Sequence, residues 1–293
     1  MRNISTNVRI YLTRTYLRAL GRVAPRLADR QALALYATPQ RRSPLRTPEV
    51  PGLVATDRSF AGPSGSLVGW SWGKGPTVLL VHGWSGDAAQ MARFVPPLVE
   101  AGFSALAFDQ PGHGYSAGRR SNLLAFRDAI STVAKTSGRV AGVVAHSLGA
   151  TATALAAASG LELPRLVLLA PPTEPTSFAW AFGRRLGLSP ERIAGMLAEM
   201  SRLLGGSLES LDLVRYAPRI GVPTLLVHDD EDPEVPSHHG RAIAAAAPSV
   251  QFLPTRGLGH HGLLKAPAIV ETAIEFLAQG LPQKAAALAA RSA

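Results

Sequence analysis

The chain has 293 residues, of which 46% are hydrophobic and 17% are charged, and it contains no cysteine. This balance excludes a disordered, collagen-like or acidic-tail protein. The length suffices for one or two domains with a large buried core. The absence of cysteine excludes a disulfide framework and any cysteine-ligated metal or redox site, which suits a cytoplasmic protein.

The net charge of +10 is concentrated at the N-terminus. Residues 1–50 hold ten arginines against two acidic residues, whereas residues 51–293 hold 20 basic and 18 acidic residues. A nucleic-acid-binding protein more often spreads positive charge over its folded face, so no nucleic-acid partner is expected. The arginines also interrupt every apolar run in residues 1–30, so no secretory signal is expected there.

The N-terminal arm begins with a predicted amphipathic helix over residues 6–24. Its apolar side chains recur at every fourth position: Val8, Leu12, Tyr16 and Leu20. Pro25 interrupts this pattern, a second short helix is expected over 27–36, and a basic linker completes an arm of residues 1–52. We expect the apolar stripe to pack on the main domain, because it would otherwise be exposed. The alternative is peripheral contact with an anionic membrane surface.

From residue 59 onward, short apolar runs alternate with helical patterns. The predicted strands cover 59–61, 67–72, 77–81, 103–108, 140–145, 166–170, 224–227 and 251–253. The predicted helices cover 90–100, 123–135, 148–158, 241–247 and 267–278. Such alternation predicts parallel βαβ units, and continuous apolar strands predict a sheet covered on both faces. We therefore predict an α/β domain over residues 53–281, followed by an alanine-rich tail over 282–293.

The alternation is broken once, between Pro171 and Pro218, by a segment with its own helical pattern. We expect about residues 174–216 to form a small helical cap at the C-terminal edge of the sheet, where doubly wound folds place their ligand crevice. Three aromatic residues of this insertion are candidates for lining an acyl pocket, or for ordinary packing within the cap: Phe178, Trp180 and Phe182.

The sharpest chemical signal is VVAHSLGA at residues 143–150, which places Ser147 between a predicted strand and a helix of small residues. This strand–turn–helix context is that of a G-x-S-x-G nucleophile elbow, with Ala145 at the first glycine position and Gly149 at the second. A serine on so tight a turn exposes its hydroxyl. Ser147 is therefore the candidate nucleophile, and a helix N-cap is its alternative role.

A serine hydroxyl needs a base, because the neutral alcohol is a poor nucleophile. His260 lies between the last strand and the final helix, so its loop is expected at the same sheet edge as Ser147; the neighbouring His261 is the alternative. A run of four acidic residues, 229–232, follows the predicted strand 224–227. Within it, Asp232 is the candidate for orienting the imidazole, and Asp230 is the alternative.

The turn His82–Gly86 follows the predicted strand 77–81 and can aim a backbone N–H group into the same crevice. We predict that the N–H groups of Trp84 and Leu148 form an oxyanion hole. His82 itself is expected to hold the turn. No metal and no cofactor are expected.

These motifs give the sequence a resemblance to α/β-hydrolase-fold serine hydrolases over about residues 59–279. Four landmarks occur in the family's order: HGWSG at 82–86, DQPGHGYS at 109–116, AHSLG at 145–149, and then Asp232 before His260. The stretch FDQPGHGYSAGRR also resembles monoacylglycerol lipase and lysophospholipase-like members. The resemblance implies the α/β-hydrolase fold and a triad of Ser147, His260 and Asp232. Ala145 and the arginine-rich arm depart from the family pattern.

The motifs favour an enzyme that cleaves carboxylic esters of small molecules through an acyl-enzyme on Ser147. Thioesterases and peptidases use the same triad, and the sequence does not separate these activities. A non-catalytic small-molecule-binding member of the fold is the alternative from another class. The presence of all three candidate triad residues argues against it.

Overall fold

The structure is a computed structural model, and it describes residues 2–41 and 47–280. The predicted tail over 282–293 lies outside the described residues, as does part of the linker. Within the described ranges, no helix has both the length and the apolar character needed to cross a membrane.

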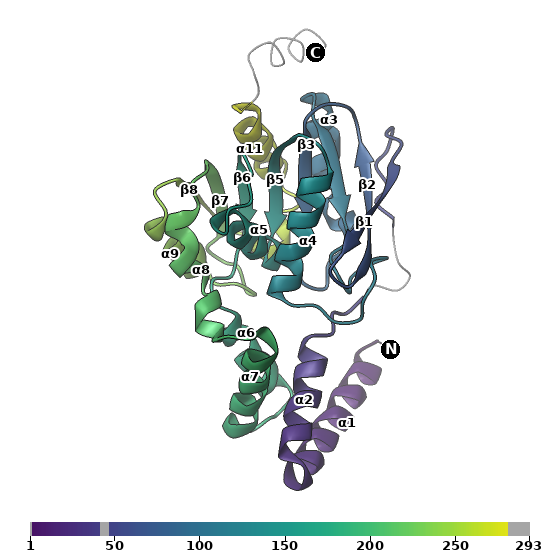
Figure 1. Cartoon of the computed structure of the whole chain (residues 1–293), viewed down its shortest axis with the longest axis vertical. Coiled ribbons are helices and arrows are strands. Elements are labelled where there is room, and N and C mark those ends of the chain that lie inside the picture. Colours follow the sequence, from purple (N-terminus) through teal and green to yellow (C-terminus); the bar gives the residue numbers. More distant parts are fainter. Residues whose placement is uncertain (1, 42–46, 281–293) are drawn as a thin grey trace. The chain divides into compact units, whose positions relative to one another are not determined.

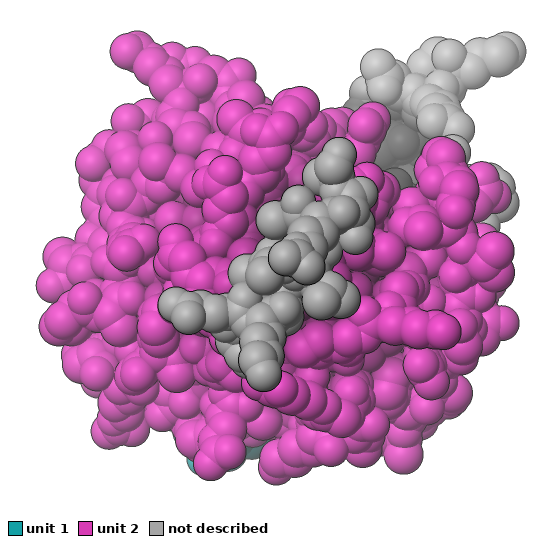
Figure 2. All heavy atoms as spheres, turned by 90° about the horizontal axis from the view of Figure 1, so that it is seen from above, with its two compact units in different colours: residues 1–38, 174–212 teal, residues 39–173, 213–293 magenta. Residues whose placement is uncertain are grey.

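The chain divides into two compact units, which are coloured separately in Figure 2. Unit 1 joins residues 1–38 with residues 174–212, and unit 2 contains residues 39–173 and 213–293. The N-terminal arm and the inserted helices therefore share one unit, although well over a hundred residues separate them in the sequence.

Unit 2 is built on an eight-stranded sheet with the order β1-β2-β4-β3-β5-β6-β7-β8. Its strands are β1 (Thr56–Gly62), β2 (Gly65–Trp72), β3 (Thr77–Val81), β4 (Ser104–Phe108), β5 (Val140–His146), β6 (Leu166–Leu169), β7 (Thr224–Asp229) and β8 (Val250–Thr255). β1 and β2 form an antiparallel hairpin and β2 runs antiparallel to β4, whereas all the other pairs are parallel. The predicted mostly parallel α/β sheet is confirmed.

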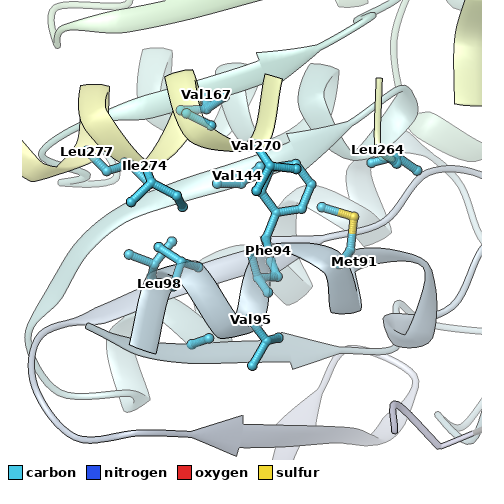
Figure 3. Packing of buried hydrophobic residues seen from close by; sticks show 14 of the residues in the cluster. Met91, Phe94, Val95, Leu98, Val144, Val167, Leu264, Val270, Ile274 and Leu277 are labelled. Atoms are coloured by element: carbon cyan, nitrogen blue, oxygen red, sulfur yellow. The ribbon is translucent and has the colours of Figure 1, made fainter. Parts of the chain in front are cut away.

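Helices cover both faces of this sheet (Figure 1). They are η1 (Ala88–Phe94), α3 (Val95–Glu100), α4 (Leu123–Thr136), α5 (Leu148–Ala158), α8 (Leu213–Tyr216), η3 (Ala217–Arg219), α9 (His238–Ala246), α10 (Gly259–Gly262) and α11 (Pro267–Ala278). α4, α5 and α9 lie on one face, and α3 and α11 lie on the other. On that second face, Phe94 and Leu98 pack with Val270 and Ile274 above Val144 of β5 (Figure 3).

The segment 90–100 differs from its prediction as one continuous helix. It begins as the 3₁₀ helix η1, which the Asp87 carboxylate caps by accepting the Gln90 N–H at 3.2 Å, and continues as the short α-helix α3. Pro96 and Pro97 explain the break. Proline has no N–H to continue a hydrogen-bond ladder from the preceding turn, but it fits the first turn of a new helix.

The parallel strands bring the predicted site segments to one edge of the sheet. β3 and β5 end in register, with Val81 opposite Ala145, and Asp229 at the end of β7 pairs with Thr255 of β8. The loops that carry the candidate nucleophile, acid, base and oxyanion donors all follow the carboxyl ends of these strands. This is the edge at which open α/β sheets bind ligands.

Unit 1 is a group of helices. It consists of α1 (Arg2–Val23), α2 (Pro25–Tyr36), α6 (Pro175–Arg185), α7 (Pro190–Leu204) and η2 (Leu208–Leu211). α2 packs against α7, and the two share a small apolar core with α6 that includes Leu33 and Met196. Asp29 of α2 also forms an ion pair with Arg192 of α7 at 3.1 Å.

The predicted packing of the arm's apolar stripe is wrong for three of its four residues. Val8, Leu12 and Tyr16 are 52%, 60% and 53% exposed, whereas Leu17 is 1% exposed. The physical reason is that the rest of unit 1 lies on the other side of the helix. Leu17 follows Val8 by nine residues, which turns it about 180° around the axis, and it is this side that unit 1 covers.

Candidate active site

Ser147 occupies a strained turn between β5 and α5. Its backbone has φ 53° and ψ −126°, and a positive φ is rare for a residue other than glycine. Its N–H donates to the Leu169 carbonyl oxygen at 2.8 Å. On the next turn, a Cβ at Gly149 would collide with the His82 carbonyl oxygen. Packing of small residues therefore holds the serine in a conformation that would otherwise be unfavourable.

The loop that follows β3 lies directly against this turn. A Cβ added to Gly83 would lie 2.8 Å from the Ser147 Cβ. His82 fixes the loop, because its Nδ1–H donates to the Gly83 carbonyl oxygen at 2.7 Å and its Nε2 accepts the Gln110 N–H at 2.9 Å. These two bonds show His82 holding the turn.

The backbone N–H groups of Trp84 and Leu148 are the predicted oxyanion donors. Leu148 directly follows Ser147, and Trp84 follows Gly83, which lies against the Ser147 turn. Neither donates a hydrogen bond to any group in residues 2–41 and 47–280. Leu148 opens α5, and the first N–H groups of a helix have no partner within the helix. Both donors are therefore available to a ligand oxygen.

A second histidine ties the loop after β3 to the loop after β4. His113 donates its Nδ1–H to the Pro111 carbonyl oxygen at 2.9 Å and accepts the Ser85 N–H at Nε2, at 3.0 Å. Burial, together with the nearby His82, lowers the pKa of His113 to about 3. The ring is therefore neutral at pH 7, as its simultaneous donor and acceptor roles require.

Asp232 and His260 form a buried pair. The His260 Nδ1–H donates to Asp232 Oδ2 at 2.7 Å, and the carboxylate of Asp232 is fully buried. The other oxygen, Oδ1, accepts the backbone N–H groups of Glu234 at 2.8 Å and Val235 at 2.9 Å. Burial alone would raise the pKa of Asp232, but these hydrogen bonds outweigh it and hold the pKa below its usual value.

The two alternative residues point elsewhere. Asp230 is exposed and pairs with Arg241 at 2.7 Å. The side chain of His261 is 53% exposed, and its Nε2 lies 3.1 Å from Glu234. Only Asp232 and His260, of the four candidates, face each other in the buried position that a triad requires.

His146 is a site residue to which the sequence assigned no role. Its Nε2–H donates to the His260 carbonyl oxygen at 3.0 Å, and the two rings lie 4.6 Å apart. Burial and the neighbouring His260 hold the pKa of His146 well below its ordinary value, so the ring is neutral. Because His146 directly precedes Ser147, this contact links the elbow to the histidine loop. Its position inside AHSLG was the only signal.

Asp229 is a second such residue. It ends β7, and its carboxylate accepts the Thr255 hydroxyl at 2.8 Å and the Leu258 N–H at 3.0 Å. These bonds fix the loop that leads into His260. The signal for this role was an acidic residue at the end of a buried strand. The candidates predicted from the sequence were only the acidic residues that follow it, Asp230 and Asp232.

The aromatic candidates of the insertion lie in unit 1 on α6. Phe182 packs edge-on against Tyr36 at 5.2 Å between ring centroids, beside the unit's apolar core. Trp180 borders an open hollow of about 630 Å³ together with Arg184 and Leu188. Phe178 is half-buried. Phe182 thus takes the ordinary packing role, because its ring contacts Tyr36 of α2 and the apolar core of unit 1.

Across the part of the chain that the structure describes, no group of three or more histidine, aspartate or glutamate side chains could hold a metal ion.

Comparison with known proteins identifies the family. The model of the alpha/beta hydrolase family matches residues 78–273. The chain belongs to this family. An uncharacterized protein of Mycobacterium tuberculosis is 31% identical over 240 residues, which cover 73% of this chain and 75% of that protein. A human serine hydrolase-like protein is 38% identical over 68 residues, covering 22% of this chain and 32% of that protein.

Solved structures agree at the level of the fold. An esterase of Pyrococcus furiosus superposes with a TM-score of 0.62 at 20% identity, covering 83% of this chain and 96% of the esterase. A serine hydrolase of Cycloclasticus zankles superposes with a TM-score of 0.57 at 17% identity, covering 76% and 98%. The predicted α/β-hydrolase fold is confirmed, and the chain is a hydrolase by family.

Proposed function

We propose that this hydrolase cleaves carboxylic esters of small molecules through an acyl-enzyme on Ser147, with His260 as the base and Asp232 as the orienting acid. The observation that supports this most is the buried 2.7 Å hydrogen bond from His260 Nδ1–H to Asp232 Oδ2. It leaves the Nε2 of His260 unprotonated, and an unprotonated Nε2 is what a serine base needs. Ser147 is the nucleophile in this proposal, and its backbone conformation at the start of α5 is that of a nucleophile elbow.

The reaction begins when Ser147 Oγ attacks the carbonyl carbon of the ester and passes its proton to His260 Nε2. The buried carboxylate of Asp232 stabilises the imidazolium that forms. The tetrahedral intermediate then collapses, and the imidazolium gives its proton to the departing alkoxide. A water molecule, deprotonated by the same Nε2, attacks the acyl-enzyme, and the acid is released with Ser147 restored.

Charge develops on the carbonyl oxygen in both steps. The N–H groups of Trp84 and Leu148 donate hydrogen bonds to this oxyanion. Both are free to do so, since neither has another acceptor in the described parts of the chain. A preorganised donor of this kind contributes about 2.7–4 kcal/mol to transition-state stabilisation. Gly83 permits the approach, because a larger residue would press on Ser147.

The test combines labelling with turnover on the full chain. A fluorophosphonate probe should label the wild-type protein at one serine, and Ser147→Ala should abolish both labelling and hydrolysis of p-nitrophenyl esters. Ser159→Ala is the matched control, because Ser159 is an exposed serine at the other end of α5 and its loss should leave both unchanged. Labelling that persists at another serine in Ser147→Ala would refute the assignment.

The acyl bond that the enzyme prefers is tested with matched substrates. A series of p-nitrophenyl esters of increasing chain length, with thioesters and anilides of the same acids, should show the highest kcat/KM for the esters. A thioester or an anilide that exceeds its matching ester would replace the ester assignment while leaving the triad intact.

A further inference from the structure

Helix α1 leaves a row of large apolar side chains uncovered. Val8, Leu12, Tyr16 and Val23 are 52%, 60%, 53% and 81% exposed. Their spacings of four, four and seven residues place them on one side of the helix. The opposite side, which includes the buried Leu17, faces the rest of unit 1. Contiguous apolar surface of this kind marks an interaction site on a folded protein.

Unpaired positive charge borders this row. Arg22 is exposed on α1, and Arg26 follows at the start of α2. Arg18 is also exposed, and its Nε–H donates to the Gly187 carbonyl oxygen at 3.5 Å. None of the three forms an ion pair with a described residue. Residues 1–38 contain seven arginines and a single acidic residue, Asp29, and Asp29 is already paired with Arg192. The partner that covers the row must therefore carry negative charge.

An open hollow lies where α1 turns into α2. Its volume is about 660 Å³, and its lining includes Arg26 and Leu27 together with Asp29, Arg30 and Arg192. Arg192 is paired with Asp29 and Arg30 with Glu199, whereas Arg26 forms no ion pair with a described residue. Guanidinium groups bind phosphate through paired N–H donors. Arg26 thus adds one guanidinium group suited to a phosphate next to the apolar row, which Val23 extends to the same turn.

We propose that α1 and the α1–α2 turn (Figure 1) dock on the surface of a bilayer that contains anionic phospholipids. The helix lies in the plane of the interface, with the apolar row in the acyl boundary and the arginines at the phosphates. Tyrosine is suited to this depth, because its ring is apolar and its hydroxyl is polar. The inference is independent of the reaction proposed above.

Two other occupants fit the surface less well. A second copy of the chain would bring the same unpaired arginines against each other, which repel. A nucleic acid would neutralise the arginines but leave Leu12 and Tyr16 in water. Only an anionic lipid surface satisfies both the apolar row and the charge, and it requires no helix that crosses the bilayer.

The experiment measures co-sedimentation of the full chain with vesicles. The protein should bind vesicles of phosphatidylcholine with about one third phosphatidylserine, should not bind pure phosphatidylcholine, and should dissociate progressively as salt is raised. Leu12→Ser with Tyr16→Ser should reduce the partition coefficient by at least about tenfold. Arg22→Gln with Arg26→Gln should reduce it by about 25-fold, at about fivefold for each arginine.

Control variants carry changes of the same kind elsewhere. Leu203→Ser removes a leucine that is 63% exposed on α7, and Arg119→Gln with Arg120→Gln removes two exposed charges from unit 2. Both should bind anionic vesicles as the wild type does. All the changed side chains are exposed, so melting temperatures should stay equal and vesicle binding should report the surface alone.

Three outcomes would overturn the proposal. The first is a wild-type protein that does not bind anionic vesicles at low salt. The second is a Leu12→Ser, Tyr16→Ser variant that binds as well as the wild type, which would indicate adhesion by charge alone, as to any polyanion. The third is an equal loss of binding in the control variants. Ester hydrolysis in free solution is unaffected by any of these outcomes.

Discussion

Replacing Asp232 by asparagine isolates the effect of one hydrogen bond on the protonation of His260. Oδ1 of Asp232 accepts two backbone N–H groups, at 2.8 and 2.9 Å, and Oδ2 accepts the His260 Nδ1–H at 2.7 Å. Only an oxygen can accept the two N–H donors, so the asparagine amide must keep its oxygen there and turn its NH₂ group toward His260. That group cannot accept a hydrogen bond from Nδ1–H.

His260 must then carry its proton on Nε2 and accept from the amide at Nδ1. This tautomer cannot take the proton of Ser147. The two side chains have nearly the same volume and the backbone hydrogen bonds remain, so the fold should be retained. Because the wrong tautomer disables the base, we expect kcat to fall about 10⁴-fold, which corresponds to about 5 kcal/mol of transition-state stabilisation. KM should change little.

The measurement is kcat for a p-nitrophenyl ester, together with the rate of fluorophosphonate labelling, which should fall in parallel. Asp230→Asn is the matched control, because Asp230 lies two residues away in an exposed ion pair with Arg241. It should retain wild-type turnover. A loss below about tenfold in Asp232→Asn, or an equal loss in both variants, would refute the reasoning.

Three further predictions follow from the same geometry. His260→Ala should lower kcat by several orders of magnitude and His261→Ala by less than about threefold; the reverse order would reassign the base. Gly83→Ala places a methyl group 2.8 Å from the Ser147 Cβ, so kcat should fall while the circular dichroism spectrum is kept, and unchanged turnover would contradict that close approach. The pKa of His113 is lowered to about 3. Between that value and about 6.5, the histidine is protonated in the unfolded chain but not in the folded chain. Its contribution to the free energy of unfolding is therefore fully present above about pH 6.5 and is lost progressively below it. Urea unfolding of His113→Gln should show a slope against pH that is smaller by about 1 kcal/mol per pH unit in this window, and an unchanged slope would mean that the ring is protonated in the fold.

The sequence predicted which segments form the site more successfully than it predicted where their side chains point. A strand ending before Ser147 and a helix of small residues after it sufficed to place the elbow at the sheet edge. His260 and His261 could not be separated in this way, because adjacent residues differ only in direction. That direction depends on α10, a helix of four residues with no periodic pattern of its own. His146 escaped notice because its contact with His260 joins residues 114 positions apart.

The sheet shows the same division between local and long-range information. Apolar runs located the central strands β3 to β7, because burial on both faces leaves a continuous signal. The edge strands β1 and β8 are partly exposed and carry a weaker signal. The strand order does not follow from those runs: β4 lies between β2 and β3, an arrangement set by pairings between distant segments. The split of 90–100 into η1 and α3 was readable, since Pro96 and Pro97 together remove two N–H donors, but the apolar pattern outweighed that signal.

The arm shows why a periodic pattern can predict a helix and still misassign its partner. α1 has apolar side chains on two sides: the buried Leu17 on one, and the exposed Val8, Leu12 and Tyr16 on the other, with the half-buried Leu20 between them. Unit 1 covers only the Leu17 side. Burying both sides within one protein would require neighbours on opposite sides of the helix. A helix that keeps a second apolar row among unpaired arginines gains nothing from that row in water, where it favours self-association over solubility. The row becomes favourable only against a surface that is both apolar and anionic, and a bilayer with acidic headgroups has both properties.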